Sequence, residues 1–243
     1  MKNIKKQSGN VLFLILIGVA LFASLTFVVG NMLRSSGAEQ ISEEKVKLYV
    51  TEVLNYGRQM KQVVSDMRIS NNCSDMDISF TRASGDAYEH SPAAPDICKA
   101  FHPSGGSMGL FRVKEDILVD STSVTKSTGY GDIHFTGDAD IDTIGTACSD
   151  GSDSECRELL LLIPYLKQQV CDEINTQLNI SGYAAKNINE HDYLDADKFK
   201  GDYATDGNAS IGFGSNELDG KAAGCFSEPD HPSYTFYQVL IAR

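Results

Sequence analysis

Tryptophan is absent from this chain of 243 residues, and so are several of the short motifs that mark common enzyme sites. No H-E-x-x-H, Walker A or dinucleotide-binding motif occurs, which argues against a metalloprotease, a P-loop NTPase and a Rossmann-type enzyme. The histidines are scattered and lack the paired carboxylates that acid–base chemistry uses. From these absences we expect a protein that is not an enzyme, with no catalytic residue and no cofactor.

Acidic residues are missing from the amino-terminal part of the chain. The 33 Asp and Glu residues outnumber the 21 Lys and Arg residues, which gives a formal charge of −12, and the first acid is Glu39. Three of the basic residues, Lys2, Lys5 and Lys6, stand at the very start of the chain. A body this acidic repels phosphate backbones, so we expect no nucleic-acid partner.

The amino terminus contains an uncharged run of 19 residues, Val11–Val29. As a helix this run is about 28 Å long, close to the ~30 Å hydrocarbon core of a bilayer. Lys2, Lys5 and Lys6 precede the run, so the positive-inside rule predicts a short cytoplasmic amino terminus and export of everything after about Asn31. We expect a single pass through the inner membrane, with the remaining chain in the periplasm.

Three kinds of segment fit such a run. A cleavable secretory signal has a shorter apolar region of about 7–15 residues, although Ser36-Gly37-Ala38 offers small residues for signal peptidase. The second kind of segment is a signal anchor that holds a periplasmic binding domain in the membrane. The third is suggested by the residues on both sides of the run.

These flanking residues are a basic leader and an amphipathic segment. Lys5-Lys6-Gln7-Ser8-Gly9 ends in a glycine directly before Asn10 and the apolar run. Beyond the run, apolar residues recur at spacings of three or four from Ile41 to Met67, which is typical of an amphipathic helix. We therefore expect one helix from about Asn10 to Met67, apolar all round in its first half and on one side in its second.

This arrangement resembles the type IV pilin and type II secretion pseudopilin superfamily. The matching residues are Lys5, Lys6, Gly9 and the run Val11–Val29. The resemblance implies that prepilin peptidase cuts after Gly9, so that Asn10 becomes the first residue. It also implies that the amino-terminal helix packs against other pilin-like subunits in a cell-surface or periplasmic filament.

Two positions depart from the family pattern. Asn10 stands where the family usually has Phe or Met, and Leu14 stands where most members carry a glutamate. In the family that glutamate is thought to pair with a neighbour's amino terminus during assembly, so its absence favours a minor subunit over a major pilin. The resemblance therefore implies a minor structural subunit whose head serves assembly or surface recognition.

The expected domains follow from this reading. They are a leader over 1–9, a transmembrane or filament-core helix half over 10–32, an amphipathic helix half over 33–70, and an exported head over 71–243. The expected fold class is α+β, with the long amino-terminal helix packed against a mixed, mainly antiparallel sheet and one further helix. Alternating and β-branched residues predict strands over 78–82, 110–119, 132–136 and 234–242. Apolar residues four apart predict a helix over 166–178, and the run over 158–163 fits either a buried strand or a helical turn.

All six cysteines lie after residue 70, and an even number in an exported chain is typical of disulfides. No C-x-x-C pair occurs and no histidine stands at zinc-like spacing from a cysteine pair, which argues against zinc. Six cysteines allow 15 pairings, and sequence alone does not select one. Loop closure favours Cys73 with Cys98, Cys148 with Cys156, and Cys171 with Cys225.

Two acidic segments are candidate calcium sites, because clustered carboxylates on a loop can supply the six to eight oxygens that calcium takes. One alternates carboxylates at Asp138, Asp140 and Asp142 but lacks the glycine and glutamate of an EF-hand loop. The other contains Asp195, Asp197, Asp202 and Asp206. The alternative for both is a plain acidic surface.

One serine matches the G-x-S-x-G pattern of hydrolases. Ser107 lies between Gly105 and Gly109, with His102 nearby in sequence. A nucleophile elbow needs a buried strand before the serine and a helix after it, and neither is expected here. An anchored serine hydrolase is therefore a third hypothesis, against which a simple turn is favoured.

Overall fold

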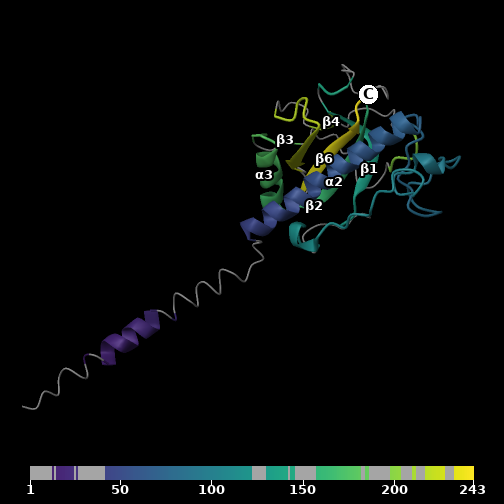
Figure 1. Ribbon diagram of the computed structural model, residues 1–243. Helices are drawn as coiled ribbons and strands as arrows, with labels where there is room; N and C mark the ends of the chain where they lie inside the picture. Colours follow the sequence, from purple (N-terminus) through teal and green to yellow (C-terminus); the bar gives the residue numbers. More distant parts are fainter. Residues whose placement is uncertain are drawn as a thin grey trace, which may run out of the picture. The chain divides into compact units, whose positions relative to one another are not determined.

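The computed structural model describes most of the chain and divides it into two compact units, Met1–Ser42 and Glu43–Arg243. The residues that it describes are 13, 15–24, 26, 42–121, 130–141, 143–145, 157–181, 184–185, 198–203, 210–211, 217–227 and 233–243. Figure 1 shows the described helix of the first unit in purple and the elements of the second unit from blue to yellow.

The described part of the first unit is a short helix over residues 15–24, and the expected long amino-terminal helix is wrong. Among the residues that the structure describes, no helix is long and apolar enough to cross a membrane. Ser24 and Thr26 donate hydrogen bonds to backbone carbonyls three or four residues earlier, and this back-bonding slightly weakens a helix. The amphipathic residues form a separate helix, which begins with its own acidic turn at Glu43 and Glu44, where negative charge suits the helix dipole.

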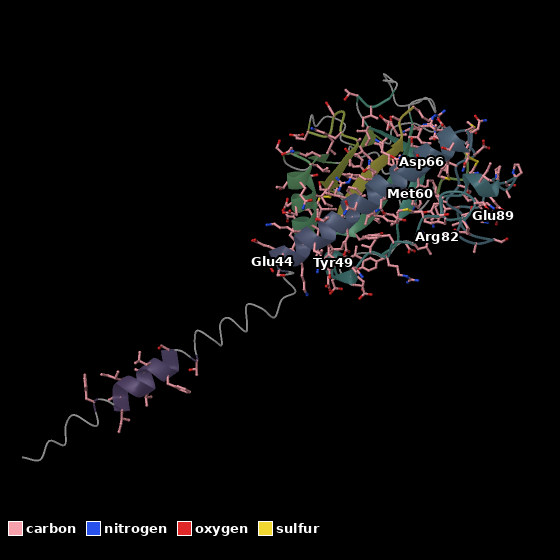
Figure 2. All side chains as sticks on the ribbon, in the orientation of Figure 1. Glu44, Tyr49, Met60, Asp66, Arg82 and Glu89 are labelled. Carbon is pink, nitrogen blue, oxygen red and sulfur yellow. A yellow bond between two sulfur atoms is a disulfide. The ribbon has the colours of Figure 1, made fainter. Side chains whose placement is uncertain are left out.

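That second helix, α2 (Glu43–Ser70), packs on the sheet of the second unit (Figure 1). Gly57 allows this close approach, because a Cβ there would lie 3.3 Å from Oε1 of Gln238 on the sheet. Figure 2 shows Met60 in the middle of α2, between Tyr49 near its start and Asp66 near its end. The buried face of α2 consists of Val46, Val50, Val53, Leu54, Tyr56, Gly57, Met60, Val64 and Met67.

The sheet has the strand order β3-β5-β6-β2-β1-β4. The four inner strands are antiparallel neighbours, whereas β3 and β4 pair parallel with β5 and β1 at the two edges. The sheet is therefore mixed and mainly antiparallel, as the sequence predicts. Its strands are β1 (His134–Ile141), β2 (Glu158–Leu166), β3 (Ala184–Ala185), β4 (Ser210–Ile211), β5 (Ala223–Ser227) and β6 (Tyr234–Ile241).

The two faces of the sheet are covered differently. Gln238 faces α2, so the alternate residues Tyr237 and Val239 of the same strand face the opposite side. On that side they pack with Leu160 and Leu162 of β2. The other buried members of this cluster are Ala139, Ile141, Ile180, Ile211, Leu218 and Phe226.

The run over 158–163 belongs to a strand, which settles the alternative left open by its sequence. Strand β2 is buried along its whole length and pairs with β1 on one side and β6 on the other. A central strand covered on both faces needs no polar alternation. This burial on both faces explains why the sequence of β2 is apolar almost throughout.

Other expected elements have mixed outcomes. The final strand is confirmed as β6, the expected helix is present as α3 (Gln168–Gln177), and β1 overlaps the strand expected over 132–136. The strands expected over 78–82 and 110–119 are wrong, because Ser79 and Leu118 make only isolated bridges. Two short 3₁₀ helices, η1 (Asp96–Cys98) and η2 (Glu115–Ile117), lie in this part of the chain.

Candidate functional site

The candidate site lies where the chain leaves α2 and enters a long irregular segment. The amides of Asn71 and Cys73 both donate to the carbonyl of Met67, at 3.1 and 3.2 Å, which closes the helix. Asn72 between them has φ 53°, the left-handed conformation that ends many helices and that asparagine tolerates. The chain therefore turns sharply away after Ser70.

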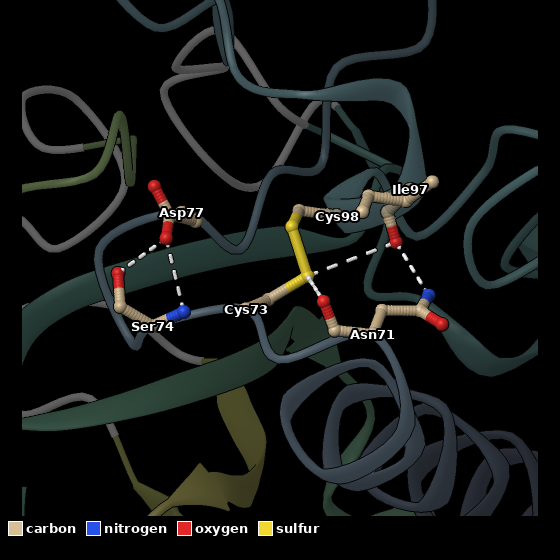
Figure 3. The surroundings of a disulfide bond; sticks show 6 residues. All are labelled: Asn71, Cys73, Ser74, Asp77, Ile97 and Cys98. Atoms are coloured by element: carbon tan, nitrogen blue, oxygen red, sulfur yellow. Dashed lines mark hydrogen bonds between the residues drawn. A yellow bond between two sulfur atoms is a disulfide. The ribbon is translucent and has the colours of Figure 1, made fainter.

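A disulfide fixes this turn to the segment around η1. Cys73 is bonded to Cys98, and Nδ2 of Asn71 donates to the carbonyl of Ile97 at 2.7 Å (Figure 3). The carboxylate of Asp77 accepts hydrogen bonds from the hydroxyl and the amide of Ser74, at 2.6 and 3.0 Å. Both hydrogen bonds lower the pKa of Asp77 below its ordinary value, and the bond from the hydroxyl has the larger effect. The turn is thus braced by one covalent bond and three local hydrogen bonds.

Aromatic packing holds the same segment against the sheet. The ring of Phe80 stacks on Phe135 of β1, with ring centroids 3.8 Å apart, and both side chains are fully buried. The hydroxyl of Tyr88 accepts a hydrogen bond from the amide of Phe135 at 3.2 Å. Segment 71–109 is therefore a fixed part of the head although it contains no long strand or helix.

A hollow of about 620 Å³ opens beside the disulfide. Asp75 lies between two guanidinium groups in its wall, with Nε of Arg68 at 2.7 Å and Nε of Arg243 at 4.0 Å. The guanidinium of Arg243 also lies over the ring of Tyr203, 3.9 Å from its centroid, a cation–π arrangement. Burial raises the pKa of the Tyr203 hydroxyl, so this ring stays neutral.

Two exposed apolar side chains, Ile69 and Met76, line the hollow, and a third, Ile97, adjoins Cys98 of the disulfide. Ile69 is 80% exposed, Met76 55% and Ile97 45%. We call the surface formed by Arg68, Ile69, Met76, Ile97 and Arg243 the α2-end surface. Arginine and methionine beside apolar side chains are enriched at protein–protein interfaces. The α2-end surface is therefore suited to binding a protein partner.

The α2-end surface contains few groups of a catalytic type. The hydroxyl of Ser74 lines the hollow and donates to the carboxylate of Asp77, whose lowered pKa makes it a weak base. In the part of the chain that the structure describes, no group of three or more His, Cys, Asp or Glu side chains could hold a metal ion. What the arrangement offers is shape, two fixed guanidinium groups and apolar contact area.

The cysteine pairing predicted from loop closure is confirmed where the structure describes it. Cys73 pairs with Cys98 and Cys171 with Cys225. Cys148 and Cys156 lie outside the described residues.

The processing residues Gly9 and Asn10 also lie outside the described residues. The same is true of Asp142, Asp195, Asp197 and Asp206 among the calcium candidates. Asp202 is described and exposed. Asp140 forms an ion pair with Arg157, with Nη1 at 3.2 Å from Oδ1.

Ser107 lies in a turn, not in a nucleophile elbow. Its hydroxyl donates to the carbonyl of Pro103 at 2.9 Å, and its φ is 49°. His102 lies in the same turn, but its Nδ1 accepts from the amide of Ser104 and its Nε2 lies 3.7 Å from Oδ2 of Asp96. No strand precedes the serine and no helix follows it in segment 101–114. The residues are near one another without the geometry that activates a serine.

Sequence reasoning missed a buried acid at the start of β2. Glu158 is fully buried, and its Oε2 accepts a hydrogen bond from the amide of Ile141 at 2.9 Å. Burial, with a smaller contribution from the nearby Asp140, raises the pKa of Glu158 to about 8, although the hydrogen bond from Ile141 acts in the opposite direction. The signal available in sequence is a charged residue directly before an uninterrupted apolar strand, where no polar position is expected.

Neither protein-family models, nor curated proteins, nor solved structures give a match to this chain. The resemblance carried by Gly9 and Val11–Val29 therefore stays a prediction. The function proposed for the protein depends on its own residues and geometry.

Proposed function

We propose that the protein is a minor pilin-like or pseudopilin-like structural subunit of a type IV pilus or a type II secretion-like filament. In this proposal the apolar amino-terminal segment holds the precursor in the inner membrane with its head in the periplasm. Prepilin peptidase then cuts after Gly9, and the chain that begins at Asn10 enters the filament. The head serves assembly or surface recognition and performs no catalysis.

The observation that carries this proposal is the exposure of apolar side chains along the short helix of the first unit. Phe22 is 70% exposed, Leu21 66% and Leu16 64%, and Phe13, Ile15 and Val19 are similarly uncovered. Burial of one such side chain stabilises by about 1.5–3 kcal/mol. Six of them left in water are a large unfavourable term, so the segment needs apolar surroundings. Lipid provides these first and neighbouring subunits provide them later.

The composition of the head supports an exported location. In the described part of the head, two disulfides brace the fold, Cys73–Cys98 beside the α2-end surface and Cys171–Cys225 between α3 and β5. Disulfides persist in oxidising compartments such as the bacterial periplasm and are rare in the cytosol. Lys2, Lys5 and Lys6 directly precede the apolar run, and the positive-inside rule places such a basic segment on the cytoplasmic side.

The proposed mechanism is mechanical. Because lipid tails and neighbouring helices are both apolar, exchanging one for the other changes the burial of apolar surface little. The α2-end surface then remains available on the head, where Ile69, Met76 and Ile97 can contact a neighbouring subunit or a surface partner. Asp75 pairs with both guanidinium groups, so these three side chains together leave one net positive charge beside the apolar contacts.

Substitution at the cleavage glycine tests the proposal. We expect Gly9→Leu to block processing and to leave the precursor in the membrane fraction, absent from sheared filament fractions. Gly18→Leu is the matched control, since nothing lies within 4 Å of a Cβ at Gly18. The control is expected to be processed and assembled. Equal recovery of both variants in filaments would contradict the proposal, and a chain that is never cut and never leaves the membrane would identify an anchored periplasmic domain instead.

A further inference from the structure

The second unit contains another hollow, away from the disulfide-braced turn, that none of the preceding functions uses. It has a volume of about 330 Å³ and lies between α2, the end of α3 and the chain around the start of β5. Its apolar lining comes from Leu54, Leu178, Ala222 and Ala223, and Gln238 contributes a side-chain amide. This volume is at the lower end of the range for small-molecule sites, and an apolar lining with few polar groups is typical of them.

The charged residues that line this hollow are all basic. Arg58 and Lys61 come from α2, and Lys221 comes from the chain just before β5. The lining residues include no Asp or Glu, although the whole chain carries 33 acids against 21 bases. Within the part of the chain that the structure describes, none of the three forms an ion pair, and Arg58 bonds only to the side chain of Asn55, at 2.7 Å. Three cations without carboxylate partners therefore meet at one hollow of an acidic protein.

The backbone around the hollow is held by hydrogen bonds that do not involve these cations. Nε2 of Gln238 donates to the carbonyl of Ala222 at 2.9 Å, and the hydroxyl of Tyr237 donates to the carbonyl of Lys221 at 3.0 Å. Gly57 lets α2 approach Gln238 closely, so α2 and β6, which both line the hollow, are in contact with each other. The site is thus formed before any ligand enters, which limits the ordering cost of binding.

We propose that this hollow binds a small organic anion, with an apolar body in the lining and a carboxylate or phosphate group at the three cations. The apolar residues exclude water from the body of such a ligand, and charge-assisted hydrogen bonds from Arg58, Lys61 and Lys221 select its head group. A neutral or cationic compound of the same shape makes the apolar contacts but lacks the charge-assisted hydrogen bonds. The proposal does not depend on filament assembly, because every lining residue belongs to the second unit.

Ligand-detected NMR titrations on the full chain in detergent micelles test this proposal, with protein-free micelles as the blank. The probes are benzoate, phenyl phosphate, benzyl alcohol and benzylammonium. We expect benzoate and phenyl phosphate to bind at least about tenfold more tightly than benzyl alcohol, because one good charge-assisted contact contributes about this much. Benzylammonium is expected to bind more weakly than benzyl alcohol. Comparison of benzoate with phenyl phosphate separates a carboxylate ligand from a phosphate ligand.

Variants locate the binding. Lys61→Gln combined with Lys221→Gln is expected to weaken the binding of both anions by about tenfold or more. The matched control, Lys45→Gln with Lys47→Gln, makes the same charge change on exposed residues of α2 and is expected to leave affinity within about twofold. Ala222→Leu narrows the hollow without changing charge and is expected to weaken binding as well. Binding no stronger than the micelle blank, equal binding of benzoate and benzyl alcohol, or equal affinity in the two double variants would overturn the proposal.

Discussion

The side chain of Asn175 on α3 binds both backbone polar groups of Cys225 on β5. Its Nδ2 donates to the carbonyl of Cys225 and its Oδ1 accepts from the amide of Cys225, each at 2.9 Å. Cys171, one turn earlier on the same helix, is bonded to Cys225 by a disulfide. Two side chains on one face of α3 thus hold a single residue of the sheet, and the amide of Asn175 takes the place of a neighbouring strand.

Removal of this amide is expected to destabilise the head strongly. Asn175→Ala leaves a buried amide and a buried carbonyl without partners, at a cost of about 1–3 kcal/mol for each group. In a domain of this size, thermal unfolding followed by circular dichroism should show a decrease in Tm of about 5 °C or more. Gln177→Ala is the control, because Gln177 bonds only to Glu173 at the helix surface and its loss should change Tm little. A similar Tm for both variants would contradict the assigned role.

The Cys171–Cys225 disulfide is expected to stabilise the head independently of that amide. Replacement of both cysteines by alanine should lower the free energy of unfolding by about 2–4 kcal/mol, because the unfolded chain regains the freedom of a long loop. The Asn175 hydrogen bonds remain in this double variant, so the fold should persist at room temperature. Denaturant titration gives the difference. An unchanged midpoint would show that the bond contributes nothing to stability.

The buried Glu158 predicts a specific dependence of stability on pH. Its pKa is raised by burial to about 8 in the folded protein, against an ordinary value of 4.5. The folded state therefore holds this proton more strongly, so the contribution of Glu158 to stability is complete below pH 4.5 and is lost as the pH rises through 8. We expect Tm to fall between pH 6 and pH 9, and we attribute about 3 °C or more of this decrease to Glu158.

Glu158→Gln should remove that part of the decrease, since the amide oxygen can still accept from Ile141. The variant is expected to be more stable than the native protein at pH 9 and no more stable at pH 5. The exposed Glu115 supplies the control: Glu115→Gln should leave the pH profile unchanged. Parallel profiles for the native protein and Glu158→Gln would contradict a neutral buried carboxyl. His134 acts in the opposite sense, because burial lowers its pKa to about 4 and its contribution is lost as the pH falls from 6.5 toward 4.

The α2-end surface is expected to serve binding and not folding. Ile69→Asp combined with Met76→Asp replaces two exposed apolar side chains, so Tm should change by less than about 2 °C while incorporation into filaments falls several-fold. Leu110→Asp, at a residue 60% exposed and outside this surface, is the control and should assemble normally. Quantification of the protein in sheared filaments provides the measurement. Normal assembly and partner binding by the Ile69 and Met76 variant would remove the role assigned to the surface.

The elements that sequence predicts well are those with strong local signals. The aromatic and β-branched residues of β6, the four-residue spacing in α3 and the short loop between Cys73 and Cys98 each identify a feature from neighbouring residues alone. The error over 10–67 has the same origin. A continuous helical pattern does not reveal where one helix ends and another begins, whereas the acidic pair Glu43 and Glu44 marks the start of the second helix.

Features that depend on distant parts of the chain could not be predicted. Segment 110–119 contains residues suited to a strand, yet among the described residues it makes a single bridge to β2 and forms η2 instead. The hollow between Leu54, Leu178 and Ala222 needs three elements to be placed together before it exists. The paired guanidinium groups around Asp75 come from residues 68 and 243, which no local pattern connects.

The central claim is that an apolar segment, freed of its basic leader but not removed, carries a disulfide-braced head into an assembly. The intact mass of the protein isolated from its own cell, with the sequence of its first residues, tests this most directly. The account predicts a chain that begins at Asn10 and has lost six hydrogens through oxidation of its six cysteines. A mature chain that begins at Glu39, with the apolar segment discarded, or one that keeps Met1 and Lys2, would contradict it.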